Sequence, residues 1–306
     1  MYDLIGDIHG HAAELHRLLK KLEYAPDAQG IYRHAAGRQV IFLGDFIDRG
    51  PAIRETLQVV RGMVDGGAAL AVMGNHEYNA LAFWEFDPGG GHLRPHWPNH
   101  ILQHMETIKE FSSKERFAEW REFLAWFRTL PLFLELPGLR VVHACWDVRY
   151  IAYLREQLPD ARLTEDFLLR ASRVGSDEFA AIEVTLKGHE TLLPNGHHFF
   201  DKDGHRRTRV RTAWWRDPAA STYRSYFLEA IEALADQPVD VAALPNSSYY
   251  QDETPVFFGH YWLSGEPQLL TPHSVCLDYS VAKGGELVAY RWHGEQVLTP
   301  TGLVRA

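Results

Sequence analysis

The chain has 306 residues, a formal net charge of −9, 46% hydrophobic and 23% charged residues, a composition typical of a globular protein with a full core. The negative balance argues against general nucleic-acid binding, which needs Lys and Arg to neutralise phosphates, and no run reaches the ~18 consecutive apolar residues of a membrane helix. Its two cysteines, Cys145 and Cys276, exclude a disulfide framework, and the start "MYDLIGD" lacks a signal-peptide pattern. We therefore expect a cytoplasmic protein without membrane partners.

The first 75 residues repeat one unit, which consists of a short apolar run, a polar loop and an amphipathic helix. "YDLIG" precedes "DIHGH", "QVIFLG" precedes "DFIDRG", and "ALAVMG" precedes "NHE". Between them, apolar residues recur at helical spacing from Leu15 to Leu22 and from Ile53 to Val64. Strands separated by such helices predict βαβ units and a sheet with a parallel portion. Three successive strands therefore end in polar loops, where open α/β sheets place their chemistry.

The middle of the chain is less regular. "DPGGGHLRPHWPNH" is a turn-rich stretch, and two helical segments follow it, the second with apolar residues on one face from Phe117 to Phe127. "LPLFLELPGLRVVH" predicts two strands joined by a hairpin at Pro137-Gly138.

The second half combines helical and strand patterns. Helices are expected near 164–185 and 222–235, and a hairpin that turns at Asp203-Gly204 is expected between them. "PVFFGHYW", "SVCLDYS" and "ELVAYRWHGEQVL" predict strands near the end of the chain, the last turning at His293-Gly294.

Five strand-like runs end in side chains that bind metals or phosphate. These side chains are Asp7, His9, Asp45, Asp48, Arg49, Asn75, His76, His143 and His260. Carboxylates, an amide oxygen and imidazoles together suit Mn, Fe or Zn rather than a thiolate site or an all-oxygen calcium site. The set is too large for one ion, whereas two ions about 3.5–4 Å apart that share a carboxylate form a standard clamp for phosphate-ester hydrolysis.

Each motif alone also has a plain structural interpretation. Gly74-Asn75-His76-Glu77 is typical of a strand-to-helix turn, in which the glycine permits the bend and the Asn75 side chain caps the helix. Asp48 and Arg49 are typical of a surface ion pair before a helix. The recurrence of polar loops at successive strand ends favours the metal-site interpretation, in which Glu77 supports its loop by hydrogen bonding.

The motifs GDxHG, GDxxDRG and GNHE, in this order and followed by two strand-end histidines, resemble the metallophosphoesterases of the phosphoprotein-phosphatase, or calcineurin-like, superfamily. "VVHA" and "CLDYSVAKGGELVAYRW" resemble its bacterial branch, which holds protein phosphatases and symmetrical diadenosine tetraphosphate hydrolases. The resemblance implies an α/β fold, a four-layer α/β/β/α sandwich. We expect one domain over residues 1–306, with helical and hairpin insertions at about 85–130 and 150–250 that cap the active site.

The resemblance implies that Asp45 bridges two divalent metal ions. The other implied ligands are Asp7 and His9 at the first ion, and Asn75, His143 and His260 at the second. Mn is the expected metal, with Fe or Zn as alternatives. A water shared by two such ions loses a proton near neutral pH and becomes a hydroxide that attacks phosphorus.

The resemblance also implies that His76 is the general acid and that Asp48 orients it. A histidine paired with a carboxylate is a credible acid near neutral pH for protonating an alkoxide leaving group. Arg49, helped by Asn75, would bind the phosphate oxygens, because arginine offers the two-pronged donor that a phosphate accepts.

The remaining basic and imidazole residues receive mainly structural interpretations. A basic run is expected to form the solvated face of a hairpin, or alternatively an arm that faces the phosphate: Lys202, Arg206, Arg207, Arg209 and Arg211. Within it, Arg211 is a candidate second phosphate-binding arginine, and Lys187 is a weaker one. A group of histidines is expected on loops and helix surfaces: His92, His96, His100 and His104.

The sequence departs from the family pattern after His143, where Ala144, Cys145 and Trp146 replace the usual small residues. Bulk at this point is expected to narrow the rim of the site, so substrate preference is not inherited from a close subgroup. Cys145 is expected to be a buried, inert thiol.

The leading functional prediction is hydrolysis of phosphomonoesters, including phosphoproteins, by a metal-bridging hydroxide. The alternative is cleavage of dinucleoside polyphosphates or capped nucleotides, so the expected partner is a phosphorylated protein or a nucleotide. A third hypothesis, a non-catalytic scaffold of the same fold, is disfavoured because such proteins lose ligands and the acid, whereas this chain keeps the full set.

Overall fold

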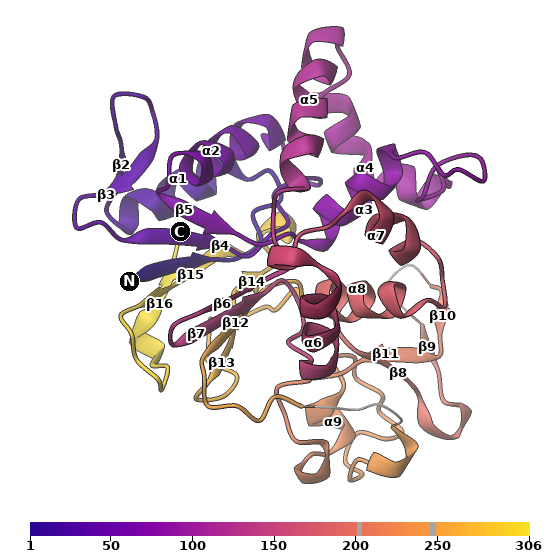
Figure 1. The fold of residues 1–306 in the computed structure, drawn as a ribbon. Coiled ribbons are helices and arrows are strands. Elements are labelled where there is room, and N and C mark those ends of the chain that lie inside the picture. The colour runs from indigo at the N-terminus through magenta and orange to yellow at the C-terminus, as the bar shows by residue number, and fades with distance from the viewer. Residues whose placement is uncertain (201–203, 245–248) are drawn as a thin grey trace.

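The computed structural model describes residues 1–200, 204–244 and 249–306, and it has two β-sheets face to face with helices outside them (Figure 1). The first sheet has the order β14-β15-β1-β4-β5, with β16 paired to β15, and the second has the order β13-β12-β7-β6. The strands of the first sheet are β1 (Tyr2–Ile5), β4 (Gln39–Phe42), β5 (Ala69–Ala71), β14 (Asp278–Tyr279), β15 (Glu286–Trp292) and β16 (Leu303–Arg305). Those of the second are β6 (Phe133–Leu136), β7 (Leu139–Val142), β12 (Val256–Phe258) and β13 (Ser274–Cys276). The predicted α/β/β/α layering is confirmed.

The strand directions agree with the repeating unit of the N-terminal sequence. β1, β4 and β5 are parallel neighbours, and β15 completes the sheet as an antiparallel neighbour of β1. In the second sheet β12 runs parallel to both β7 and β13. β6 and β7 form the predicted hairpin, in which Gly138 has a φ of 83° that favours glycine. Parallel neighbours bring the carboxyl ends of their strands to one edge of each sheet.

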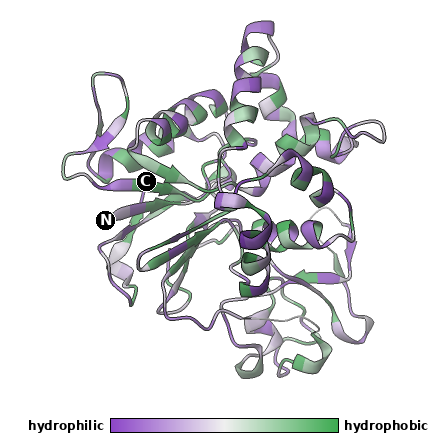
Figure 2. Ribbon diagram, in the orientation of Figure 1, coloured by the Kyte–Doolittle hydropathy of each residue, from purple (hydrophilic) through white to green (hydrophobic). Residues whose placement is uncertain are grey.

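Successive side chains of each strand point to opposite faces of its sheet, so the strands contribute to two layers of core. One set of side chains is buried between the sheets: Leu4, Ile41, Val141 and Phe257. Their chain neighbours point to the opposite faces and are buried under the helices: Ile5, Phe42, Val142 and Phe258. Figure 2 shows apolar residues concentrated in the strands and on the helix sides that face them. Because both faces are covered, the strands read as continuous apolar runs rather than as alternating ones.

Helices cover the outer faces and surround the edge where the strands end (Figure 1). Their bounds are α1 (Ala12–Lys21), α2 (Ile53–Asp65), α3 (Asn75–Trp84), α4 (Pro98–Glu110), α5 (Lys114–Phe127), α6 (Val148–Gln157), α7 (Glu165–Ala171), α8 (Asp177–Lys187) and α9 (Tyr223–Tyr226). α1 and α2 lie on the first sheet, and α6 and α8 lie beside the second. None of the described helices combines the length and the apolar character needed to cross a membrane.

Within the described ranges, three small antiparallel pairs lie outside the two main sheets. They are β2 (Tyr24–Pro26) with β3 (Tyr32–His34), β8 (Glu190–Leu192) with β11 (Arg209–Arg211), and β9 (Phe199–Phe200) with β10 (Arg206–Arg207). The expected hairpin is therefore divided: β9 pairs with β10, whereas β11 pairs with β8. Asp203 of its expected turn lies outside the described residues.

Two other predictions were wrong in extent. The sequence predicts a helix over 222–235, but within this described segment only α9 is an α-helix. It ends there because Phe227 is extended and pairs with Thr212. The apolar residues there, such as Ile231 and Leu234, instead fill a small separate core. β15 ends at Trp292, but no strand of the described chain follows directly after His293-Gly294. The backbone N–H of Leu298 donates to Pro272 instead, and the chain pairs again with β15, in antiparallel direction, only at β16.

Candidate metal centre

The predicted site residues lie together where strands of both sheets end. Asp7 and His9 follow β1, Asp45 follows β4, His143 follows β7, and His260 follows β12. The side chains are almost fully buried, with exposed fractions of 8% or less: Asp7, His9, Asp45, Asp48, Asn75, His76, His143 and His260. Burial of so many charged and imidazole groups is costly unless they have partners of opposite charge.

The backbone at the site is strained. Non-glycine residues adopt left-handed conformations, with φ of 47° at His9, 55° at Asp45, 67° at Asp48, 66° at Arg49 and 73° at His260. Residues other than glycine rarely adopt this left-handed backbone conformation. Such strain collects at functional sites, where the surrounding structure holds it in place.

Two glycines permit the close approach of the loops. A Cβ on Gly259 would lie 1.9 Å from Asp7 Oδ1, and one on Gly74 would lie 2.3 Å from Asp45 Oδ1. Neither separation is possible between real atoms, so both carboxylates depend on a neighbour without a side chain.

Glu77 supports the loop by hydrogen bonding, as expected. Its carboxyl oxygens accept bonds from the backbone N–H groups of Asp45 at 2.8 Å, Phe46 at 2.8 Å and Gly74 at 3.0 Å. Burial raises the pKa of Glu77 to about 7. Glu77 thereby caps α3 at Gly74, and the prediction that the Asn75 side chain forms this cap is wrong. The Asn75 side chain is instead free to enter the site.

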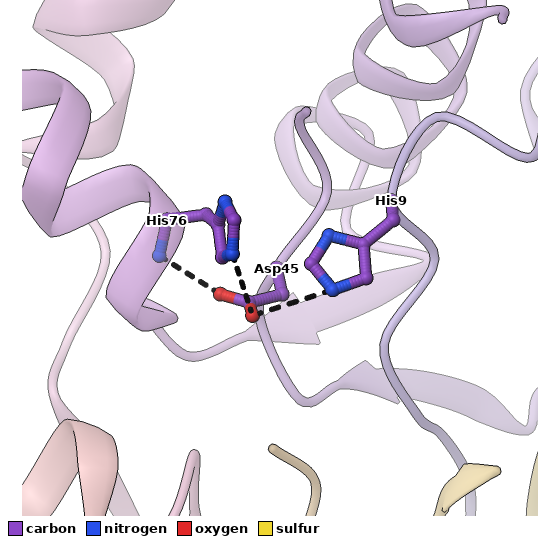
Figure 3. A group of neighbouring side chains, drawn as sticks. All are labelled: His9, Asp45 and His76. Atoms are coloured by element: carbon purple, nitrogen blue, oxygen red, sulfur yellow. Dashed lines mark hydrogen bonds and ion pairs between the residues drawn. The ribbon is translucent and has the colours of Figure 1, made fainter. Parts of the chain in front are cut away.

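The first cluster of side chains that could hold an ion consists of His9, Asp45 and His76, whereas Asp7, an expected ligand of the first ion, is not part of it (Figure 3). His9 Nε2 lies 3.6 Å and His76 Nε2 lies 3.9 Å from Asp45 Oδ2. The backbone N–H of His76 donates to Asp45 Oδ1 at 2.9 Å. Figure 3 shows both imidazole rings turned toward this one carboxylate.

The second cluster consists of Asp45, His143 and His260. His143 Nε2 lies 3.4 Å from Asp45 Oδ1. Asn75 Oδ1 completes the group, at 3.1 Å from His143 Nε2 and 2.7 Å from His260 Nδ1. The two clusters share Asp45, the residue expected to bridge two ions.

The buried acceptor atoms of the site are better suited to binding divalent cations than to hydrogen-bonding with one another. His9 Nδ1 lies 3.0 Å from the carbonyl oxygen of Ile47, which only accepts, so the proton is on Nδ1 and Nε2 carries a lone pair. Burial lowers the pKa of His9 to about 3, so the ring is neutral and its lone pair faces the Asp45 carboxylate. Within the described chain, His9 Nε2, Asp7 Oδ1 and His260 Nε2 are buried without a hydrogen-bond partner. Buried acceptors without a donor are the kind of atom that a divalent cation would satisfy.

His76 contacts Asp48 directly. His76 Nδ1 lies 2.5 Å from Asp48 Oδ2, so its Nε2 is directed to the cluster. Burial would lower the pKa of His76, but Asp45 and Asp48 outweigh it and raise that pKa above its usual value. The arrangement can hold a proton on His76 Nε2, as a general acid requires.

Helix α4 supports Asp48 through His104, which is a correction to the sequence analysis. His104 is 5% exposed rather than on the helix surface, and its Nδ1 lies 2.8 Å from Asp48 Oδ1. Trp84 Nε1 can only donate, and it does so to His104 Nε2 at 3.1 Å, while His104 Nδ1 donates to Asp48. Thr107, one turn later, donates its hydroxyl to the same oxygen at 2.5 Å. His104 and Thr107 are three residues apart and therefore share one face of the helix, and this spacing is the sequence pattern that could have indicated a common contact.

These hydrogen bonds keep Asp48 charged. Burial would raise the pKa of Asp48, but His104 and His76 outweigh it and hold that pKa well below its usual value. Asp48 therefore stays an acceptor for His76 over the whole neutral range.

Arg49 lies over the ring of Trp262, a residue outside the predicted site. Its guanidinium carbon is 4.1 Å from the centre of the Trp262 ring, and the ring of His9 stacks on the same tryptophan at 5.6 Å. Lys283 Nζ also lies 3.7 Å from that ring centre. Trp262 thus holds the guanidinium beside the metal cluster by cation–π contact.

A cavity of about 670 Å³ opens over the two clusters. Its basic lining residues are Arg49, Arg94, Lys187, Arg209 and Arg211, and its acidic ones are Asp45, Glu183 and Glu190. Arg211 and Lys187, the two candidate phosphate ligands, are therefore both placed beside the site. Cys145 and Trp146 are buried and are not among the lining residues, so the expected narrowing of the rim does not occur. Burial raises the pKa of the Cys145 thiol, in line with an inert side chain.

Residues 2–260 match the profile of the family described as calcineurin-like phosphoesterase. The chain belongs to this family. The clusters around Asp45 are where its fold brings together His and Asp side chains that could hold divalent ions.

Similar proteins include two bis(5'-nucleosyl)-tetraphosphatases. The asymmetrical one of Bacillus subtilis (strain 168) is 32% identical over 149 residues, which cover 47% of this chain and 57% of that protein, so the chain spans little more than half of that relative. The symmetrical one of Janthinobacterium sp. (strain Marseille) is 26% identical over 93% of this chain and 90% of that protein. A solved structure of a putative diadenosine tetraphosphatase covers 100% of this chain and 92% of its own, with 18% identity and a TM-score of 0.45.

Proposed function

We propose that this phosphoesterase hydrolyses dinucleoside polyphosphates. The observation that carries the proposal is the basic cavity: five cationic and three acidic side chains line it, and one of the three acids, Asp45, belongs to the metal clusters. A concentration of cations beside a metal site attracts and holds a chain of phosphates. The names of the two tetraphosphatase relatives support the same substrate class.

The proposed roles follow the predicted assignment. Two divalent ions, for which Mn is the proposed metal, are held by Asp7, His9, Asp45, Asn75, His143 and His260. The ions, when bound, supply a water acidified to near neutral pH and neutralise charge on the phosphate. Arg49 and Asn75 bind the oxygens of the phosphate that is attacked, and His76, oriented by Asp48, gives a proton to the leaving group.

The proposed domain organisation agrees with the origin of the cavity lining. Arg94 belongs to the 85–130 segment, and Lys187 and Arg211 belong to the 150–250 segment. Both segments are proposed as insertions that cap the site of a single domain. Their cations would then select the substrate while the strand ends perform the reaction.

A second candidate is hydrolysis of phosphomonoesters, including phosphoproteins. The contact between His76 and Asp48 favours it, because an alkoxide leaving group must be protonated as it departs, whereas a phosphate leaving group is already a good one. The substrates in this case are serine, threonine or tyrosine phosphates on a peptide.

The two candidates are tested by a rate comparison with Mn as the metal. Diadenosine tetraphosphate and peptides carrying phosphoserine, phosphothreonine or phosphotyrosine are compared by kcat/KM. The proposal expects the tetraphosphate to be preferred by at least about tenfold, a difference of about 1.4 kcal/mol. Asp45→Asn is the inactive control for every substrate. A tenfold preference for a phosphopeptide would overturn the leading proposal in favour of the second.

A further inference from the structure

Arg94 is an arginine of the cavity wall whose charge has no carboxylate partner. It lies in the loop before α4, where its Nη1 donates to Asn79 Oδ1 at 3.2 Å and its Nη2 donates to Gln103 Oε1 at 2.9 Å. Both acceptors are neutral amide oxygens, and no ion pair of Arg94 with a carboxylate occurs among the described residues. The guanidinium stays charged at neutral pH. It is therefore fixed in position by neutral partners, without a carboxylate in direct contact.

The other insertion cations in the cavity differ in this respect. Lys187 forms an ion pair with Glu183. Arg209 Nε and Arg211 Nε lie 3.9 Å and 4.0 Å from the carboxylate of Glu190. Burial lowers the pKa of Arg94, and the more distant carboxylates of Glu183 and Asp48 offset this only in part. An incoming anion gains more from Arg94 than from a cation that is already paired.

The position of Arg94 relative to the reaction follows from helix α3. Asn79, which holds the guanidinium, comes three residues after His76, so the two side chains share a helix face, with a rise of about 4.5 Å between them. His76 and Arg94 line the same cavity. Arg94 is therefore held, through Asn79, about one helical turn along α3 from His76, the residue to which the proposed function assigns the proton for the leaving group.

We propose that Arg94 binds the phosphate of the leaving group in polyphosphate substrates, and this inference rests on the proposed function. When water attacks, its oxygen forms a bond to phosphorus and gives up a proton to solvent, and the bridging P–O bond breaks. The electron pair of that bond goes to the leaving phosphate, which gains negative charge beside Arg94. A positioned guanidinium stabilises this charge as it develops.

The same contact distinguishes the two substrate classes. The leaving group of a phosphomonoester is an alcohol and brings no phosphate to the place of Arg94. A nucleoside polyphosphate leaving group always carries a phosphate that can reach Arg94. Arg94 would thus make the site selective for phosphoanhydrides over phosphomonoesters, while Arg49 serves both.

The test is Arg94→Gln, with Arg94→Lys as a variant that keeps the charge but loses the two-pronged donor. Wild type and variants are assayed on p-nitrophenyl phosphate, inorganic tripolyphosphate and diadenosine tetraphosphate. In Arg94→Gln we expect kcat/KM to fall about 10- to 100-fold for both polyphosphates, the range for a hydrogen bond to a charged group, and to change less than about threefold for p-nitrophenyl phosphate. Arg94→Lys should recover part of the loss. Arg17→Gln, an exposed change on α1, is the matched control.

The outcomes separate the two proposals. Equal losses on all three substrates, or no loss on any, would overturn the role of Arg94 while leaving the proposed function intact. A wild-type enzyme that turns over p-nitrophenyl phosphate with metal but cleaves neither polyphosphate would overturn the proposed function and the role of Arg94 with it. Activity on p-nitrophenyl phosphate reports that each variant is folded.

Discussion

At the scale of single residues, one carboxylate connects the whole site. Asp45 lies 3.6 Å from His9 Nε2 through one oxygen and 3.4 Å from His143 Nε2 through the other. Asp45→Asn keeps the shape but removes the charge that both histidine clusters face. We expect kcat to fall on the order of 100- to 1000-fold, the loss typical when charge stabilisation at a reaction centre is removed. Steady-state rates with p-nitrophenyl phosphate measure it, and a variant within threefold of wild type would refute the assignment.

Gly259 tests the geometry beside Asp7. A Cβ at this position would lie 1.9 Å from Asp7 Oδ1, so Gly259→Ala must displace that carboxylate. We expect fewer bound metal ions per chain and at least tenfold lower activity. Gly62→Ala is the matched control, because a Cβ there meets no atom within 4 Å and alanine favours the helix. Equal metal content in both variants would show that Asp7 is not a ligand.

At the scale of elements, α4 is coupled to the proton donor. His104 and Thr107 both bond to Asp48, which bonds to His76. We infer that His104 positions Asp48. In His104→Gln we expect hydrolysis of a phosphoserine peptide to fall about tenfold more than hydrolysis of p-nitrophenyl phosphate, since the activated leaving group needs little protonation. A uniform loss over both substrates would indicate a structural role only, and Lys109→Gln on the exposed side of α4 is the control.

The strand ends with Asp7, Asp45 and Asn75 were predictable from the sequence, because apolar runs, glycines and polar loops are local patterns. His104 and Arg94 were not, since their partners are set by packing between α3, α4 and the loops. His104 meets a residue 56 positions away in the chain. The helical spacing of apolar residues near 222–235 gave a wrong prediction of a long helix, because those side chains fill a small core instead.

At the scale of the whole molecule, metal binding and stability are linked. Asp7, Asp45 and Asp278 are buried together, and burial followed by their mutual repulsion raises the pKa of Asp7 and of Asp278. Divalent ions bound only by the folded state relieve this repulsion. At a free concentration about 1000 times the dissociation constant, one ion adds about 4 kcal/mol to the free energy of unfolding. We expect chelation to lower Tm by several degrees, measured by calorimetry, and to lower it less in Asp45→Asn. A Tm that chelation leaves unchanged in wild type would contradict this linkage.

The two clusters that share Asp45 lead to one decisive measurement, the metal stoichiometry of the active enzyme. Protein stripped with a chelator is titrated with Mn while bound metal and the rate of p-nitrophenyl phosphate hydrolysis are followed together. A dinuclear centre predicts that stripping abolishes activity and that the rate returns fully only as the second equivalent per chain binds. Full activity after stripping, or full recovery with one equivalent, would contradict a centre built on two ions bridged by Asp45.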